Sequence, residues 1–141
     1  MIKEAYCSFE VAKLLKKKGF PQEYDIFHSM VYNEEDYEDE YEVQRMVLET
    51  RLIKAGTASS YPAGVPEPKC YCPTHQMAMA WLREEHKICI VISPISGKGY
   101  TAILCDVSDF DDFNYIGETY YFFHPEEAVE AALKYSLKNL I

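Results

Sequence analysis

Three stretches of the chain carry apolar residues at helical spacing, and each begins beside a residue that favours a helix start. Ser8 and Thr74 are favourable N-caps, since a hydroxyl can accept a hydrogen bond from an otherwise unpaired backbone N–H. Pro125 is favoured at the first helical position, with His124 before it as the capping residue. Gly19 is a favourable stop for the first stretch. We therefore predict helices over 9–18, 75–86 and 125–139.

Stretches rich in β-branched and aromatic residues lie between these helices. We predict strands over 25–32, 47–53, 87–93, 100–107 and 119–123. The segment 41–54 also fits a helix loosely, because its apolar residues recur near helical spacing. We favour a strand there, because the acidic run before it then joins the two arms of a hairpin. Residues 94–99 are predicted to form the turn of a second hairpin.

Charge and turn-forming residues predict the connections between these elements. Six of the eight residues from Glu34 to Tyr41 are acidic, so we expect an exposed acidic turn over 33–42. Three prolines and two glycines in 55–69 predict a loop, and 106–117 is also expected to be an acidic loop.

The order of elements indicates the fold class. Helix, two strands, helix, three strands and helix predict an α+β fold, with three helices packed against a mostly antiparallel sheet of about 4–5 strands. A chain of 141 residues fits a single domain over 1–141.

Composition narrows the classes of partner. The 23 acidic residues outnumber the 14 basic ones, which gives a net charge of -9. This balance argues against direct nucleic-acid binding and against docking on anionic membranes, where basic residues supply the attraction. The sequence shows no signal peptide, and its five cysteines are an odd number, so we expect reduced thiols and a cytoplasmic location.

Candidate metal ligands lie close together where the predicted loop meets the second helix. Cys70, Cys72 and His75 offer the thiolate and imidazole groups that zinc prefers. Their spacing is not that of a standard zinc finger, so a fourth ligand such as His28 or Cys7 would have to come from elsewhere. A thiol nucleophile formed by Cys72 with His75 is a weaker hypothesis, and the simplest interpretation is that both cysteines are structural. No catalytic signature is present, which favours a protein that is not an enzyme.

The acidic run is the candidate partner-binding segment. Tyrosines alternate with carboxylates there, a composition typical of recognition surfaces, although a solvated turn is the simpler interpretation. The residues of this candidate surface are Tyr32, Glu34, Glu35, Asp36, Tyr37, Glu38, Asp39, Glu40 and Tyr41.

Three segments carry a resemblance to other proteins. SFEVAKLLKKKGF at 8–20, CPTHQMAMAWLREEH at 72–86 and HPEEAVEAALKYSL at 124–137 resemble short uncharacterised proteins of gut bacteria and of their phages and mobile elements. The segments cover about a third of the chain, and the middle one is the most specific. The resemblance implies a small intracellular protein of phage or mobile-element type, and it assigns no catalytic residues.

These observations lead to three functional hypotheses. The first is a non-enzymatic module that binds another protein; its specific form is an acidic decoy for a basic host protein. The second is a zinc- or thiol-dependent protein centred on Cys70, Cys72 and His75. The third is a structural homodimer without a ligand, associating through exposed aromatic residues of 108–123.

Overall fold

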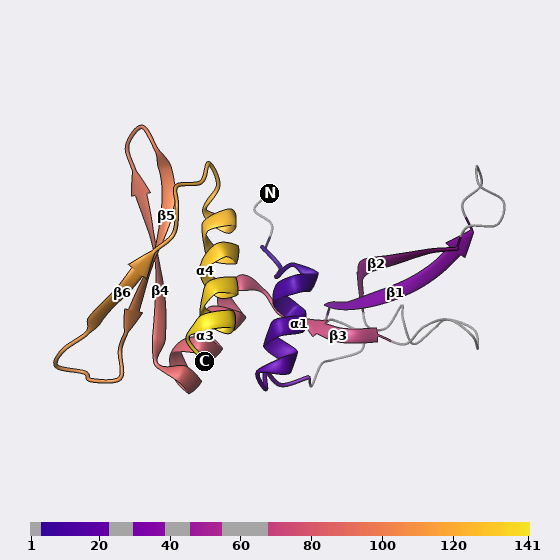
Figure 1. The fold of residues 1–141 in the computed structure, drawn as a ribbon, viewed down its shortest axis with the longest axis horizontal. Helices are drawn as coiled ribbons and strands as arrows, with labels where there is room; N and C mark the ends of the chain where they lie inside the picture. The colour runs from indigo at the N-terminus through magenta and orange to yellow at the C-terminus, as the bar shows by residue number, and fades with distance from the viewer. Residues whose placement is uncertain (1–3, 23–29, 39–45, 55–67) are drawn as a thin grey trace. The chain divides into compact units, whose positions relative to one another are not determined.

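A computed structural model describes residues 4–22, 30–38, 46–54 and 68–141 of the chain. Contacts divide it into two compact units, one formed by Met1–Phe20 with Pro73–Ile141 and the other by Pro21–Cys72. The elements are α1 (Phe9–Lys17), β1 (Met30–Glu38), β2 (Met46–Lys54), β3 (Pro68–Cys72), α3 (His75–His86), β4 (Ile88–Ile95), β5 (Gly99–Asp106), β6 (Asn114–Glu118) and α4 (Pro125–Asn139) (Figure 1). Within the described residues, no helix is long and apolar enough to cross a membrane.

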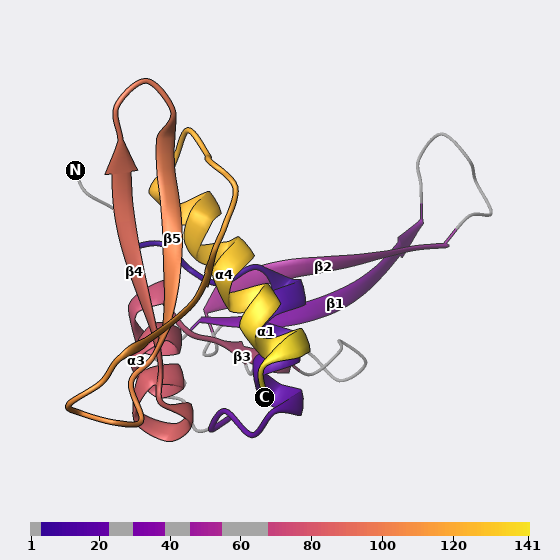
Figure 2. The same ribbon diagram turned by 60° about the vertical axis from the view of Figure 1, so that its left-hand side comes forward.

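The larger unit packs its helices against a three-stranded antiparallel sheet in the order β4-β5-β6. Helix α4 contacts β4 and β5, α3 contacts β4, and α1 packs on α4. Two views show α4 running beside the β4–β5 hairpin (Figures 1 and 2). The sheet and α1 are therefore joined mainly through α4.

The core of the larger unit follows the helical spacing of the apolar residues. Helix α4 buries a stripe three and four residues apart, while α1 and α3 contribute smaller faces. These residues are Val11, Ala12, Leu15, Ala78, Leu82, Ala128, Val129, Ala132, Leu133 and Leu137. At the end of α1, Phe20 meets Trp81 of α3 edge-on, with ring centroids 5.4 Å apart.

The predicted helix boundaries are confirmed to within one residue. The hydroxyls of Ser8 and Thr74 accept hydrogen bonds from the backbone N–H three residues later. Gly19 follows α1 in a left-handed conformation, with φ of 98°. His124 takes the N-cap position of α4, but its side chain makes no capping hydrogen bond. A negative first turn, with Glu126 and Glu127, supports this helix start through the helix dipole.

The smaller unit is a second antiparallel sheet in the order β2-β1-β3. The prediction of a strand for part of 41–54 is confirmed by β2, which pairs with β1 from Met30↔Lys54 to Glu38↔Met46. The prediction of a turn over the whole of 33–42 is wrong, because residues 33–38 belong to β1. Charge determines solvation and not backbone conformation, and backbone pairing with β2 is possible for any side chain.

The end of the predicted loop 55–69 also differs from the structure. Pro68 and Lys69, which we assigned to a loop, begin β3, and β3 pairs with β1 at Tyr32↔Cys70 and Met30↔Cys72. The rest of that loop, and residues 25–29 of the first predicted strand, lie outside the described residues.

The last predicted strand is also displaced. It lies at Asn114–Glu118, and all but its last residue fall inside the segment predicted as a loop, while 119–123 contributes only the isolated bridge Tyr100↔Phe122. Thr119 explains the change. Its Oγ1 accepts the backbone N–H of Ala102 at 2.9 Å, so a side chain takes the place of a backbone carbonyl and ends the regular ladder.

The α+β class and the antiparallel pairing are confirmed. One difference is that the six strands of the described chain form two three-stranded sheets, whereas we expected one sheet. The prediction of one domain over 1–141 stays a prediction.

Candidate functional site

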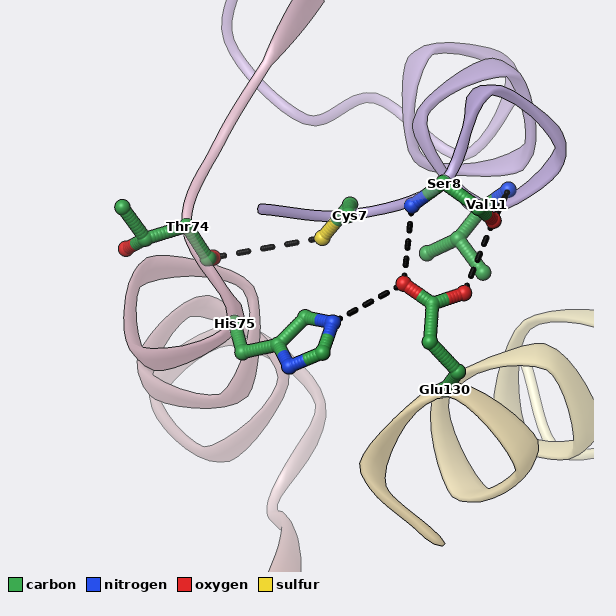
Figure 3. A network of polar contacts seen from close by, with 6 residues as sticks. All are labelled: Cys7, Ser8, Val11, Thr74, His75 and Glu130. Atoms are coloured by element: carbon green, nitrogen blue, oxygen red, sulfur yellow. Dashed lines mark hydrogen bonds and ion pairs between the residues drawn. The ribbon is translucent and has the colours of Figure 1, made fainter. Parts of the chain in front are cut away.

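A buried polar cluster forms where the beginnings of α1 and α3 meet the second turn of α4. The Nε2 of His75 lies 2.9 Å from Oε1 of Glu130. The same Oε1 accepts the backbone N–H of Ser8 at 2.8 Å, and Oε2 accepts the Ser8 hydroxyl at 2.7 Å (Figure 3). One carboxylate thus joins three helices.

Backbone bridging explains why these residues meet. Segment 5–7 runs antiparallel to segment 73–75, with an isolated bridge between Tyr6 and Thr74. The N–H of Cys7 donates to the carbonyl of Pro73 at 3.0 Å, and the N–H of His75 donates to that of Ala5 at 2.8 Å. This pairing places the Cys7 and His75 side chains beside Glu130 (Figure 3).

Glu130 is held ionised by its partners. Burial alone would raise the pKa of its carboxyl group. The hydrogen bonds from His75 and Ser8 outweigh that effect and leave the pKa below its ordinary value. Only a quarter of the Glu130 side chain is exposed. The first function of the cluster is therefore structural, because the carboxylate anchors the N-terminal ends of α1 and α3.

The cluster also has the chemistry of a metal site. Cys7, His75 and Glu130 each offer a ligand atom, and these atoms lie within 4.8 Å of one another. The Cys7 side chain is fully buried, and its Sγ lies 3.9 Å from the Thr74 carbonyl oxygen. Thiolate, imidazole and carboxylate are the ligands that zinc takes in proteins. A thiol nucleophile is disfavoured at Cys7, because a substrate would not reach a sulfur without exposed surface.

The sequence-predicted metal ligands belong to two different compact units. His75 belongs to the cluster of the larger unit, where its companions are Cys7 and Glu130. Cys70 and Cys72 lie on β3 of the smaller unit, and both are buried. The sequence could suggest Cys7 as a distant ligand, but no local signal marked Glu130, which lies 55 residues from His75.

The sequence-predicted partner surface falls on β1 and beyond it. Tyr32 and the five residues from Glu34 to Glu38 lie on β1. Asp39, Glu40 and Tyr41 lie outside the described residues.

A second candidate surface lies in the segment 106–123 of the larger unit. Phe110, Tyr120 and Phe123 are 87%, 88% and 88% exposed. Large aromatic side chains that are this exposed make the segment a candidate interaction surface. We call the exposed residues of this segment the acidic–aromatic surface: Phe110, Phe113, Tyr115, Tyr120, Tyr121 and Phe123, with Asp109, Asp111, Asp112 and Glu118.

The charged residues of the acidic–aromatic surface are all acidic. The sequence contains no lysine or arginine between Lys98 and Lys134. Lys98 itself lies over the ring of Tyr121, with Nζ 4.9 Å from the centroid, so a ring of this surface already contacts a cation. A groove of about 620 Å³ adjoins the surface, and its lining includes Ile116 of β6 and Tyr135 of α4.

Comparison with protein-family models, curated proteins and solved structures gave no match to this chain.

Proposed function

We propose that the protein is a non-enzymatic interaction module of phage or mobile-element type, and that it binds a basic protein partner through the acidic–aromatic surface. The observation that carries this proposal is the pair of exposed rings, Tyr120 and Phe123, in a segment without lysine or arginine. The partner surface predicted over 32–41 stays a prediction.

The size of the surface is adequate for recognition. A large aromatic side chain buries about 150–250 Å² when it is covered. Three of the six rings are already partly buried, so covering all six would remove roughly the 800 Å² per partner that a specific interface buries. The carboxylates around the rings favour a partner that brings lysine or arginine, because oppositely charged surfaces attract and like charges repel.

A titration with defined peptides tests this function. The probe is a short synthetic peptide that alternates lysine with isoleucine or phenylalanine, and the matched control carries glutamate at each lysine position. We expect amide NMR shift changes confined to 106–123 and the groove, with affinity that weakens as salt is added. Substituting both Phe110→Ser and Phe123→Ser should abolish the changes, whereas Val91→Ser, at an exposed position on β4, should not.

Two outcomes would refute the proposal. One is the absence of shift changes with the lysine peptide at about 1 mM, a concentration that corresponds to a binding free energy of about −4 kcal/mol. The other is equal affinity for the lysine and glutamate peptides, which would show that the surface does not select its partner by charge.

A second candidate function, zinc binding, is favoured by one observation: the convergence of Cys7, His75 and Glu130. The three residues supply one thiolate, one imidazole and one carboxylate, and a fourth position would be left for water. His75 also lines a cavity of about 310 Å³, which gives an ion a route to the cluster. Binding would have to replace the His75–Glu130 hydrogen bond, so the ion competes with the structural function of the carboxylate.

Native mass spectrometry with added zinc chloride tests this candidate. We expect one tightly held zinc ion per chain, lost in Cys7→Ser and in His75→Gln. Cys89→Ser is the matched control, since Cys89 lies on β4 and does not belong to the three-residue ligand group. Loss of zinc in Cys70→Ser or Cys72→Ser, with retention in Cys7→Ser, would assign the ion to the sequence-predicted ligands instead. A chain that stays metal-free would refute both assignments.

A further inference from the structure

We propose that the partner of the acidic–aromatic surface binds as an extended strand added to the outer edge of β6. This inference rests on the proposed function and specifies how the partner binds. Strand β6 is at the edge of the sheet: within the described residues it pairs with β5 on one side, and no strand of this sheet lies on its other side. Four of its five residues are exposed. Every second residue of such an edge turns its N–H and C=O groups away from the sheet, where another chain can pair with them.

The two edges of this sheet are built differently. β4, the opposite edge, contains Pro94. The N–H of Val107 donates to the carbonyl of Lys87 at 2.8 Å, and the β4–β5 register is continuous. In an antiparallel pair every second residue bonds the neighbouring strand, so the odd-numbered residues of β4 bond β5. The backbone nitrogen of Pro94 therefore faces away from β5. Proline there removes an outward donor, a common protection of an edge strand. β6 reads Asn-Tyr-Ile-Gly-Glu, with neither proline nor lysine, so its edge can still accept a strand.

The length of β6 limits what can be added. The strand has five residues, and its register with β5 shifts between Leu104 and Cys105. Because β6 is short and contains a bulge, it offers few backbone groups to an added strand and pairs poorly with a long, flat strand. We therefore expect the added segment to be short and to be held by its side chains as well as by its backbone.

The groove and the carboxylates define those side chains. An added strand would run beside the groove that Ile116, Tyr120 and Tyr135 help to line. Side chains alternate along a strand, so one set can enter the groove while the other meets Glu118 and the neighbouring aspartates. The occupant is therefore a segment that alternates apolar or aromatic residues with lysine or arginine. A second copy of β6 fits poorly, because it would bring the same carboxylates together.

Backbone N-methylation of the lysine peptide separates strand addition from other modes of binding. The methylated peptide keeps its charge and side chains but loses alternate N–H donors. We expect its dissociation constant to rise about tenfold or more, since each lost backbone hydrogen bond weakens binding several-fold. Hydrogen exchange at the outward amides of β6 should slow only with the unmethylated peptide. Ala131→Trp, at a position that lines the groove, should also weaken binding, whereas Val91→Trp on β4 should not.

Each result of this experiment is decisive. Equal affinity of the methylated and unmethylated lysine peptides would overturn strand addition and leave the proposed function standing. If neither of these peptides binds, both strand addition and the proposed function are overturned. A dimer of the protein, detected by light scattering and blocking the peptide, would overturn the basic partner and identify a second copy as the occupant.

Discussion

Glu130→Gln isolates the contribution of the carboxylate that joins the three helices. The charged group accepts hydrogen bonds from the Ser8 amide, the Ser8 hydroxyl and His75, over 2.8, 2.7 and 2.9 Å. Glutamine has nearly the same shape, but it is neutral and turns an N–H₂ group toward one of these donors. Hydrogen bonds to charged groups contribute about 1.5–3 kcal/mol each. Since a quarter of the side chain is exposed and water can replace part of the loss, we expect a destabilisation of about 2–3 kcal/mol.

Urea unfolding near neutral pH, with a chelator present to exclude metal effects, measures this loss. Thermal unfolding gives a second measure: for a chain of this size we expect the melting temperature to fall by roughly 6–12 °C, at about 3–4 °C per kcal/mol. Glu126→Gln is the control, because Glu126 is an exposed glutamate in the first turn of the same helix. A cycle that adds Ser8→Ala should show coupling of about 1 kcal/mol or more. If Glu130→Gln and the control unfold at the same urea concentration, Glu130 does not join the helices as described.

The acid dependence of stability gives a second readout of the same carboxylate. The pKa of Glu130 is lowered in the folded protein, so its stabilisation is complete above the unfolded value of about 4.3 and is lost as the pH falls through the folded pKa. The difference in unfolding free energy between wild type and Glu130→Gln should therefore shrink in acid below about pH 4.3. A difference that stays constant down to the acid limit of folding would contradict an ionised Glu130.

Two further substitutions test the packing of the larger unit. Gly99→Ala should destabilise the protein by several kcal/mol, because φ is +107° and an added Cβ would overlap the carbonyl oxygen of Phe122. Gly97→Ala should cost only about 1 kcal/mol, because φ is +77° but the space around it is open. Equal stability of the two variants in urea unfolding would contradict this reasoning. Leu133→Ala, at a fully buried position of α4, should lower the free energy of unfolding by about 2–5 kcal/mol. Leu140→Ala, at the partly exposed end of the helix, is the comparison. An equal or smaller loss of stability in Leu133→Ala would contradict the assignment of Leu133 to the core.

Local chemistry made most of the fold predictable. Helix boundaries depend on caps and stops that act within one turn, such as Ser8, Thr74 and Gly19, and these were read correctly. The strand errors arose where a local signal competes with pairing. The acidic run suggested a turn, yet β2 pairs with it along its length. Aromatic residues suggested a strand at 119–123, yet the hydroxyl of Thr119 interrupts the ladder there.

The candidate sites were less predictable because they depend on distant contacts. Ser8 and Glu130 are 122 residues apart, and no spacing rule connects them. Cys70, Cys72 and His75 are close in sequence, but the ligand group of the larger unit takes only His75 from this set. The sequence predicts the aromatic residues of 108–123 as candidates for association, whereas their exposure and the position of β6 at the edge of its sheet, among the described residues, come from the structure.

The capping of α1 has a consequence for how the chain folds during synthesis. In a common local motif, a glutamate three residues after the N-cap returns to bond the N-cap amide, but that position is Val11 here. Glu130 supplies the missing acceptor from the far end of the chain. On the ribosome, α1 emerges more than a hundred residues before its own cap partner, so its beginning stays incompletely bonded until α4 has been made. Helix α1 should therefore become stable only after α4 has been made, and a nascent chain that ends before α4 should show rapid amide exchange at Ser8.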